Sequence, residues 1–270
     1  MATKLNFALL HEVSHTTLNT IRRYTVHMTV GTERRGTAVL AKNGLALSNI
    51  RRFPFGGGMS AKVRDMLIVN IYSHSGAEKR QEREAFYNTE VVHLIPSSSM
   101  AMILAGDFNC VLTNDDFTRR RNYSRGLARL IQWLGLIDVW EATPKRTAYT
   151  HCTATGASRI DRIYITHDLR RRQQGAEKVV AVFTDHFAVI LCLTMDVTCS
   201  IRGKGYWRMN VSFEWTILPT NNEGELEKIA DTYEILSKLS NVVVPIREEN
   251  DTPTVGPWRS RPPPRPSRNG

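Results

Sequence analysis

The chain has 270 residues, of which 41% are hydrophobic, and it carries a formal net charge of +10. This size allows one domain with a substantial core, with or without a tail, and no apolar run approaches the roughly 18 residues that a membrane-spanning helix needs. The four cysteines form no Cys-x-x-Cys pair, which argues against a zinc site or a disulfide framework. The N-terminus lacks a signal-peptide pattern, so we expect a nuclear or cytosolic protein.

Short apolar runs predict buried or half-buried strands, and two amphipathic stretches predict helices between them. The second helix has Ser124 as a predicted N-cap. Strands that interleave with helices predict layered α/β or α+β packing, and the glycine-rich residues 53–60 predict a turn. The predicted strands are Phe7–His11, Gly36–Ala41, Met66–Tyr72, Met100–Ala105, Arg162–Thr166, Val179–Phe183 and Phe187–Leu193, and the predicted helices are Glu78–Ile95 and Ser124–Leu136.

The composition changes after the last of these strands. We predict a domain over residues 1–196, a connector over 197–251 that includes a helix at Glu225–Leu239, and a tail over 252–270. The tail contains six of the 11 prolines, four arginines and no acidic residue. Such a segment cannot bury enough apolar surface to fold, so we expect it to be disordered or polyproline-like.

Positive charge is concentrated in the predicted domain, which holds 26 of the 36 Lys and Arg but 17 of the 26 Asp and Glu. A basic surface favours a nucleic acid, because it neutralises phosphates and releases counterions. Any single pair of arginines is more often part of an ordinary solvated surface, whereas five clusters favour nucleic acid. The clusters are Arg22–Arg23, Arg34–Arg35, Arg51–Arg52, Arg119–Arg121 and Arg170–Arg172.

Polar side chains follow the predicted strands where each strand ends. Asp107 and Asn109 come after Met100–Ala105, and on extended backbone residues i and i+2 share a face. A carboxylate and an amide on one face can hold a metal, a water or a substrate oxygen, although an Asx turn that closes the strand explains the pair equally well. Glu12 also ends a strand, where a lone carboxylate is costly and a divalent cation would justify it.

Two further acidic residues and a histidine precede predicted strands. Asp185 and His186 lie before Phe187–Leu193 and can provide a metal ligand and an acid, or they can simply cap the strand. Asp161 precedes another strand and can orient His186 and favour its charged form, or it can form a surface salt bridge with Arg159 or Arg162. Tyr72 ends a strand and can offer its hydroxyl to a phosphate, although a tyrosine there is more often part of the core.

Taken in order, the motifs LHEV, VNIYSHSG, GDFNCVL, YTH, SRIDRIYIT and TDHFAVIL resemble the endonuclease/exonuclease/phosphatase superfamily. RRGTAVLAKNGL (34–45) and SGAEKRQEREAFYNTEV (75–91) resemble its apurinic-endonuclease-like branch in arthropod-type non-LTR retrotransposons. GKGYWRMN (203–210) resembles the segment that links this nuclease to the reverse transcriptase. The resemblance covers about residues 8–215 and implies a four-layered α/β sandwich of the DNase I-like type.

The resemblance implies a role for each polar residue at a strand end. Asp107 would position or deprotonate the attacking water, and Asn109 would align the phosphate with the nucleophile. Asp161 would orient His186, which would stabilise the developing phosphorane charge. Thr150 would support this group.

The same resemblance implies how metal and DNA are held. Glu12 and Asp185 would bind Mg²⁺, for which Mn²⁺ can substitute; Asp185 could also act on the leaving group, and Tyr72 would contact the scissile phosphate. DNA would be contacted by Arg34, Arg35, Arg119, Arg120 and Arg121.

The expected function is that of an Mg²⁺-dependent endonuclease that nicks target DNA by phosphodiester hydrolysis and so primes reverse transcription. Its expected partner is DNA in the nucleus, with no membrane and no small-molecule cofactor besides the metal. One alternative is an inactive remnant that at most binds DNA, for which a cytoplasmic location is expected. The other is a phosphatase of the same superfamily acting on a lipid or inositol phosphate, which the basic surface disfavours.

The sequence departs from the family pattern at both ends. The family begins with a further strand, bearing an Asn-Gly-type motif, and a helix, whereas this chain begins almost at LHEV. We therefore expect that strand and helix to be missing and a gap or open edge beside Phe7–His11. Asn6 cannot replace the missing asparagine, because six residues of strand place it about 20 Å from Glu12. No reverse transcriptase follows within the 270 residues.

Overall fold

The computed structural model describes residues 6–13, 23–31, 36–53, 56–96, 100–118, 122–141, 149–180, 184–195, 240–244 and 246–248. The helical elements are α1 (Arg80–Ala85), the π-helical η2 (Phe86–Glu90), α2 (Val91–Leu94), the 3₁₀ turn η3 (Asn114–Asp116), α3 (Arg125–Leu134) and α4 (His167–Arg170). The strands are β1 (Phe7–His11), β2 (Tyr24–Thr29), β3 (Thr37–Lys42), β4 (Ser48–Arg52), β5 (Gly58–Val63), β6 (Met66–Tyr72), β7 (Ala101–Asp107), β8 (Ile137–Asp138), β9 (His151–Thr153), β10 (Gly156–Ser158), β11 (Asp161–Ile165), β12 (Gln173–Val180), β13 (Phe187–Met195), β14 (Ser240–Val244) and β15 (Ile246–Glu248).

Two sheets and a two-stranded ribbon contain these strands. The first sheet has the order β12-β13-β14-β1-β3-β2, with β15 also paired to β13. The second sheet has the order β4-β5-β6-β7-β11-β8, and β9 pairs with β10 outside both sheets. Within the second sheet β6 and β7 are parallel, while β11 runs antiparallel to β7.

Alternation along the strands explains how the layers pack. In β1, Phe7 and Leu9 face the core between the two sheets, whereas Ala8 and Leu10 face the opposite side of the first sheet. In the second sheet, residues such as Ile68 join the core between the sheets. The residues that alternate with them along the same strands pack against the helices. These strands are therefore covered on both faces, which is why their sequences are continuous apolar runs.

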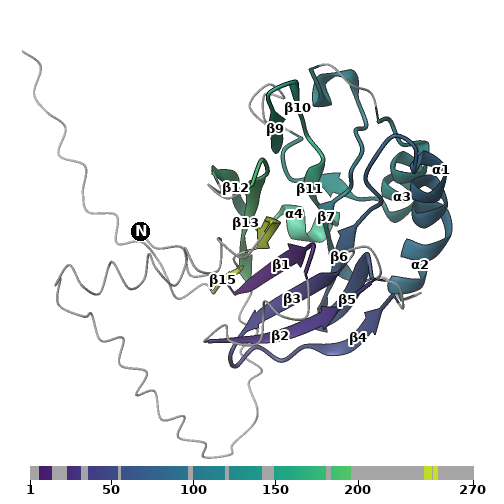
Figure 1. Cartoon of the computed structure of the whole chain (residues 1–270). Coiled ribbons are helices and arrows are strands. Elements are labelled where there is room, and N and C mark those ends of the chain that lie inside the picture. The colour runs from purple at the N-terminus through teal and green to yellow at the C-terminus, as the bar shows by residue number, and fades with distance from the viewer. Residues whose placement is uncertain are drawn as a thin grey trace, which may run out of the picture.

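The helices α1, η2, α2 and α3 cover the outer face of the second sheet (Figure 1). Ser124 caps α3 as predicted, because its Oγ accepts a hydrogen bond from the Leu127 N–H at 3.1 Å. The predicted helix over 78–95 begins at Arg80 and ends at Leu94, and its middle is a π-helical turn. Phe86 and Tyr87, adjacent in sequence, are both buried in this turn. The predicted layered α/β architecture is confirmed.

Two of the seven predicted strands, β1 and β6, have the predicted bounds, and four others are shifted or longer. The first two residues of the predicted strand Val179–Phe183 belong to β12, and residues 181–183 lie outside the described ranges. The sequence did not predict the other described strands, namely β2, β4, β5, β8, β9, β10, β14 and β15. The reason is clearest in β4, whose SNIRR sequence is almost entirely exposed and has no apolar periodicity.

Strand β1 lies inside its sheet and has no open edge. It pairs with β3 on one side and with β14 on the other, both antiparallel. β14 in turn pairs in parallel with β13, so residues 240–244 close the position where we expected a gap or an edge. Two strands of the sheet thus come from the range 197–251 that was predicted to be a connector.

Several predictions concern residues outside the described ranges. They are the helix at Glu225–Leu239, the segment at 203–210, the tail at 252–270 and the arginines Arg34, Arg35, Arg119, Arg120 and Arg121. In the part of the chain that the structure describes, no helix is long and apolar enough to cross a membrane.

Candidate active site

The register of the second sheet places three of the predicted residues side by side. Tyr72 at the end of β6 is the partner of Asp107 at the end of β7, and Asp107 is also the partner of Asp161 at the start of β11. All three are buried, Asp161 completely. The strand ends therefore place a phenol and two carboxylates along one edge of the sheet, as predicted from the positions of these residues after or before apolar runs.

Gly106, which precedes Asp107, lets the end of β7 lie close against the neighbouring strand β6. Its φ is +151°, and a Cβ at this position would lie 1.8 Å from the backbone oxygen of Ile71 on the neighbouring strand. Only glycine can make this close approach. The glycine before Asp107 is thus required by the pairing of β6 with β7.

Asn109 and Asp107 form the Asx turn that was one of the two explanations for this pair. The backbone N–H of Asn109 donates to Asp107 Oδ1 at 2.8 Å, and the Asn109 amide donates to Asp107 Oδ2 at 3.2 Å and to the Ser73 carbonyl at 3.0 Å. Asn109 has a φ of +48°, which asparagine tolerates better than most residues. The turn and the site are therefore the same structure, since the turn fixes both carboxylate oxygens of Asp107.

Asp161 pairs with His186, as the sequence suggested. His186 Nδ1 donates to Asp161 Oδ2 at 2.9 Å. The competing explanation, an ion pair of Asp161 with a neighbouring arginine, is wrong. Arg159 and Arg162 turn instead to Asp138, and Arg162 also contacts Asp116 at 2.6 Å.

Thr150 holds the two segments that carry this pair. Its Oγ1 accepts hydrogen bonds from the backbone N–H groups of Ile160 and Asp161 at 3.2 and 3.0 Å, while its carbonyl accepts from Phe187 N–H at 2.6 Å. Thr150 is completely buried. Thr150 therefore links the start of β11, which carries Asp161, to the start of β13, which follows His186.

Burial and charge shift the pKa values of the central groups in ways that suit proton transfer. Burial, and after it the neighbouring carboxylate of Asp161, raise the pKa of Asp107 to about 8. Burial by itself would lower the pKa of His186, but Asp161, with help from Asp107 and Asp185, raises it to about 9. Near pH 8 the site therefore contains a carboxylate that can accept a proton beside an imidazolium that can stabilise negative charge.

Glu12 lies at the edge of this group, directly after β1. Its Oε1 accepts a hydrogen bond of 2.6 Å from the Tyr72 hydroxyl, and the ring of His11 stacks on Tyr72. Glu12 has a φ of +56° and an exposed side chain, and its charge contributes to the raised pKa of Asp107. The first sheet thus supplies a carboxylate to the same electrostatic environment.

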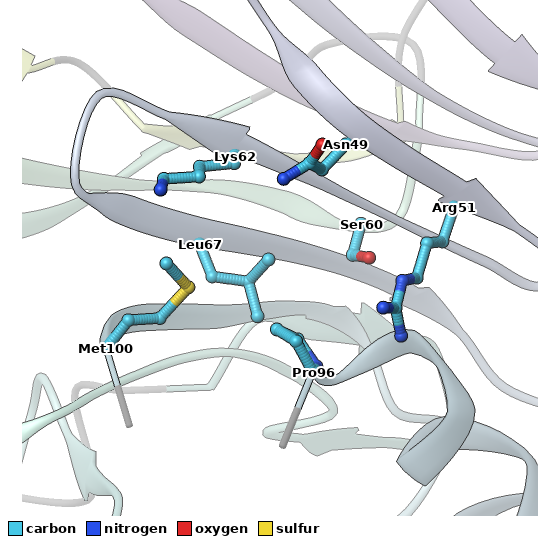
Figure 2. A pocket seen from close by; sticks show the side chains of 7 residues that line it. All are labelled: Asn49, Arg51, Ser60, Lys62, Leu67, Pro96 and Met100. Atoms are coloured by element: carbon cyan, nitrogen blue, oxygen red, sulfur yellow. The ribbon is translucent and has the colours of Figure 1, made fainter. Parts of the chain in front are cut away.

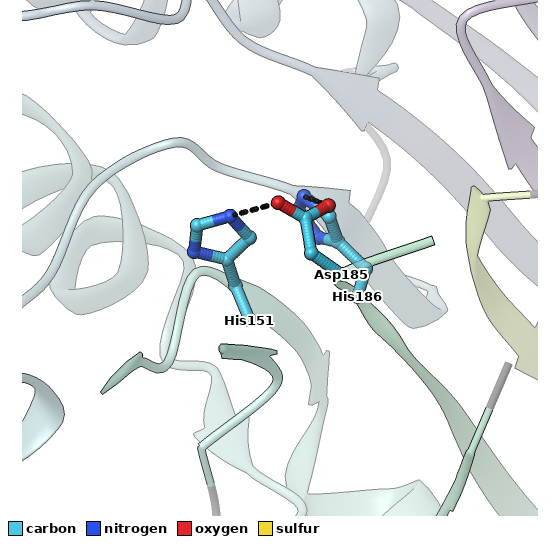
Figure 3. Close-up of side chains that lie close together, drawn as sticks. All are labelled: His151, Asp185 and His186. Carbon is cyan, nitrogen blue, oxygen red and sulfur yellow. Dashed lines mark hydrogen bonds and ion pairs between the residues drawn. The ribbon is translucent and has the colours of Figure 1, made fainter. Parts of the chain in front are cut away.

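Asp185 contacts a residue that the sequence analysis quoted in the YTH motif without giving it a role. His151 Nε2 lies 3.0 Å from Asp185 Oδ2, and Figure 3 shows both side chains directed toward each other beside His186. The ligand atoms of His151, Asp185 and His186 lie within 4.8 Å of one another, as do those of Asp107, Asp161 and His186. Among the described residues these are the groups of three or more whose spacing suits a metal, and Glu12 belongs to neither.

A buried residue between the sheets also escaped sequence analysis. The Asn70 amide donates to the carbonyls of Leu10 on β1 and Ala38 on β3 at 3.2 and 2.9 Å, and its Oδ1 lies 2.8 Å from His11 Nε2. This network joins the strand that ends in Tyr72 to the strand that precedes Glu12. No local pattern could have identified it, because its partners lie 32 to 60 residues away.

A cavity of about 130 Å³ lies elsewhere, lined by residues of β4, β5 and β6 and by Pro96 and Met100 (Figure 2). Two of its polar side chains already make structural contacts. Ser60 Oγ donates to the Leu94 carbonyl at 2.7 Å, and Arg51 donates to the His93 carbonyl at 3.2 Å. None of the predicted site residues lines this cavity.

Comparison with known sequences identifies one protein family. The profile described as "Endonuclease/Exonuclease/phosphatase family" matches residues 4–186. The "Transposon TX1 uncharacterized 149 kDa protein" of Xenopus laevis is 31% identical over 175 residues. That alignment covers 62% of this chain and 12% of the Xenopus protein, so the chain spans only a small part of its relative's length. Both matches confirm the resemblance to a family domain of the type found in transposable elements.

Similar solved structures confirm the α/β sandwich. A Neisseria 3′ phosphatase bound to a product DNA hairpin has a TM-score of 0.57 at 14% identity and covers 67% of this chain and 86% of its own. An AP endonuclease from Archaeoglobus fulgidus has a TM-score of 0.55 at 16% identity, covering 67% and 85%. A 3′–5′ exonuclease from Neisseria meningitidis has a TM-score of 0.52 at 14% identity, covering 67% and 86%. At these identities the likeness establishes the fold.

Proposed function

The chain belongs to the endonuclease/exonuclease/phosphatase family, and we propose that it is an Mg²⁺-dependent DNA endonuclease of a transposable element. In this proposal it acts in the nucleus, nicks target DNA by phosphodiester hydrolysis, and leaves a 3′ hydroxyl that primes reverse transcription. The observation that carries the proposal is the arrangement of Asp107, Asp161 and His186 beside Tyr72 and Glu12. The basic composition of the chain supports DNA as the substrate.

The donors at the site suit a hard divalent cation. Glu12 and Asp185 have exposed carboxylates, and Asp161 Oδ1 is buried with no hydrogen-bond partner among the described residues. In the proposal Glu12 and Asp185 hold Mg²⁺, which binds oxygen ligands and retains several waters; Mn²⁺ can substitute. When bound, the cation supplies positive charge to a phosphate oxygen.

The chain's own residues provide the remaining functions. Asp107, with both oxygens fixed by Asn109, accepts the proton of the attacking water, and its raised pKa makes it a competent base near pH 8. Asn109 aligns the water with the phosphate. Tyr72 directs its hydroxyl toward the position of the scissile phosphate.

His186 stabilises the negative charge that develops on the phosphorus oxygens. It does so as an imidazolium, the form that Asp161 favours through a 2.9 Å hydrogen bond and its charge. Asp185 assists at the leaving group. Contacts with the DNA backbone are assigned to Arg34, Arg35, Arg119, Arg120 and Arg121.

Nicking of a supercoiled plasmid by the full chain tests this proposal, with Mg²⁺ or with EDTA. We expect relaxed circles only with Mg²⁺, and a loss of at least about 100-fold in His186→Ala, as for removal of a group that stabilises transition-state charge. His93→Ala is the matched control, because His93 is an exposed histidine on α2, outside the site. Parental nicking by His186→Ala, or by Asp107→Ala, would show that the site is wrongly assigned.

DNA binding in gel shifts distinguishes the remaining alternatives. Folded chain that binds DNA in a salt-dependent way but does not nick it would identify an inactive remnant. Equal hydrolysis of a soluble phosphomonoester would favour a phosphatase instead.

A further inference from the structure

We propose that His151, Asp185 and His186 form a binding site for a transition-metal dication such as Zn²⁺, which shares only Asp185 with the carboxylate site proposed for Mg²⁺. The site takes Nε2 of each histidine and one carboxylate oxygen. Its occupation would switch off the nuclease, because the metal takes the imidazole nitrogen that faces the phosphate. The metal site stands on its own geometry, and only the switch rests on the proposed function.

The three side chains already converge on one point (Figure 3). His151 Nε2 lies 3.0 Å from Asp185 Oδ2, and His186 Nε2 lies 4.0 Å from Asp185 Oδ1. The two imidazole rings are 4.5 Å apart between centroids. Ligand atoms around tetrahedral Zn²⁺ are roughly 3.3–3.5 Å apart, so small side-chain movements would complete the coordination.

Both histidines have their other ring nitrogen engaged, which directs Nε2 toward the metal position. Asp161 Oδ2 accepts from His186 Nδ1 at 2.9 Å, and Ser158 Oγ lies 3.4 Å from His151 Nδ1. Metal-binding histidines almost always have such a partner on the second nitrogen, because it fixes the ring and the tautomer. Finding it at both histidines distinguishes this group from a chance cluster.

The backbone holds the two segments together independently of any ion. The backbones of His151 and His186 pair in an isolated antiparallel β-bridge. Next to it, the Cys152 N–H donates to the Asp185 carbonyl at 2.9 Å. The ligands are therefore preorganised, with Asp185 about half exposed so that an ion can enter from solvent.

The ligand chemistry separates this site from the one proposed for Mg²⁺. Two imidazoles and one carboxylate suit Zn²⁺, Co²⁺ or Ni²⁺, whereas Mg²⁺ prefers oxygen ligands only. Three protein ligands also match the zinc sites that keep a fourth position for water. Binding would occupy Nε2 of His186 and engage Asp185, so both the imidazole and one proposed Mg²⁺ ligand would be lost from the nuclease.

Co²⁺ binding to the full chain tests the site without any reference to activity. We expect one Co²⁺ per chain with the visible absorption of a four- or five-coordinate ion, displaced by Zn²⁺. His151→Ala should raise the Kd at least about tenfold, and His93→Ala should not change it. Cys152→Ser should also leave the Kd unchanged, which excludes the exposed neighbouring thiol as the ligand. Unchanged binding in His151→Ala, with circular dichroism confirming the fold, would overturn the proposal.

Inhibition of nicking tests the switch. At saturating Mg²⁺, Zn²⁺ should inhibit the parental chain, and His151→Ala should need at least about tenfold more Zn²⁺ for half-inhibition relative to its own uninhibited rate. Equal sensitivity of the two proteins would refute the switch. A chain that binds Co²⁺ through His151 but never nicks DNA would uphold the metal site and refute the proposed function.

Discussion

Replacing Asp161 with asparagine would remove one buried negative charge while keeping an oxygen that can accept the Nδ1–H of His186. In the native chain that charge offsets burial and helps to raise the pKa of His186 from 6.5 to about 9. At about 1.36 kcal/mol per pKa unit, the shift corresponds to roughly 3 kcal/mol. Without the charge, burial is opposed only by Asp107 and Asp185, and we expect the pKa of His186 to fall to about 6.5 or lower.

The consequence for activity follows from the sign of each shift. At pH 8.5 the protonated fraction of His186 would fall from about three-quarters to about 1%. The pKa of Asp107 would fall too, because the charge of Asp161 contributes to its raised value. Both limbs of a bell-shaped pH–rate profile should therefore move to lower pH, the alkaline limb by at least about two units.

Nitrogen-15 NMR of the imidazole groups measures the pKa of His186 directly, and plasmid nicking across pH 5–10 measures the profile. Asp65→Asn is the control, since Asp65 is exposed in the turn between β5 and β6. A native His186 that titrates near 6.5, or an Asp161→Asn variant in which it still titrates above 8, would refute the electrostatic account.

Four further predictions concern stability, measured as the urea midpoint of unfolding. Burial lowers the pKa of His11 to about 4, so the stabilisation from keeping this imidazole neutral is complete above pH 6.5 and is lost as the pH falls toward 4. His11→Gln should therefore remove roughly 3 kcal/mol from the pH dependence of the unfolding free energy. Gly106→Ala should cost at least about 2 kcal/mol, because its Cβ would strike the Ile71 carbonyl; an unchanged midpoint would contradict the pairing of β6 with β7. Thr150→Val leaves two buried N–H groups without their acceptor and should cost about 2 kcal/mol. Val243→Pro removes an N–H inside the first sheet and should cost about 3 kcal/mol, whereas no effect would mean that β14 does not hold its place there.

An ionic network includes the two arginines on either side of Asp161 in β11 and its approach, Arg159 and Arg162. Arg162 is fully buried, and burial opposes its charge, but Asp138 and Asp116 are among the groups that hold its pKa above the ordinary value. Asp116 in turn accepts backbone hydrogen bonds from Leu112 and Thr113. Both arginines beside Asp161 pair with other acidic residues, so the partner of Asp161 is His186.

The sequence by itself determined those features that depend on local pattern. Continuous apolar runs identified the strands that are covered on both faces, and the polar residues after or before them marked the edge where the site lies. Asn109 could be recognised as a turn-forming residue, since its backbone preference is intrinsic. Exposed β4 escaped detection, because a strand without a buried face has no apolar alternation.

The tertiary structure alone decided which of these residues meet. From the sequence, Asp161 could pair with His186 or with a neighbouring arginine. In the fold it pairs with His186, while both neighbouring arginines pair with Asp138. The contact of His151 with Asp185 and the insertion of β14 between β1 and β13 also join residues distant in the chain. Hydrogen bonds and burial act between atoms that folding brings close, and no spacing along the chain encodes that distance.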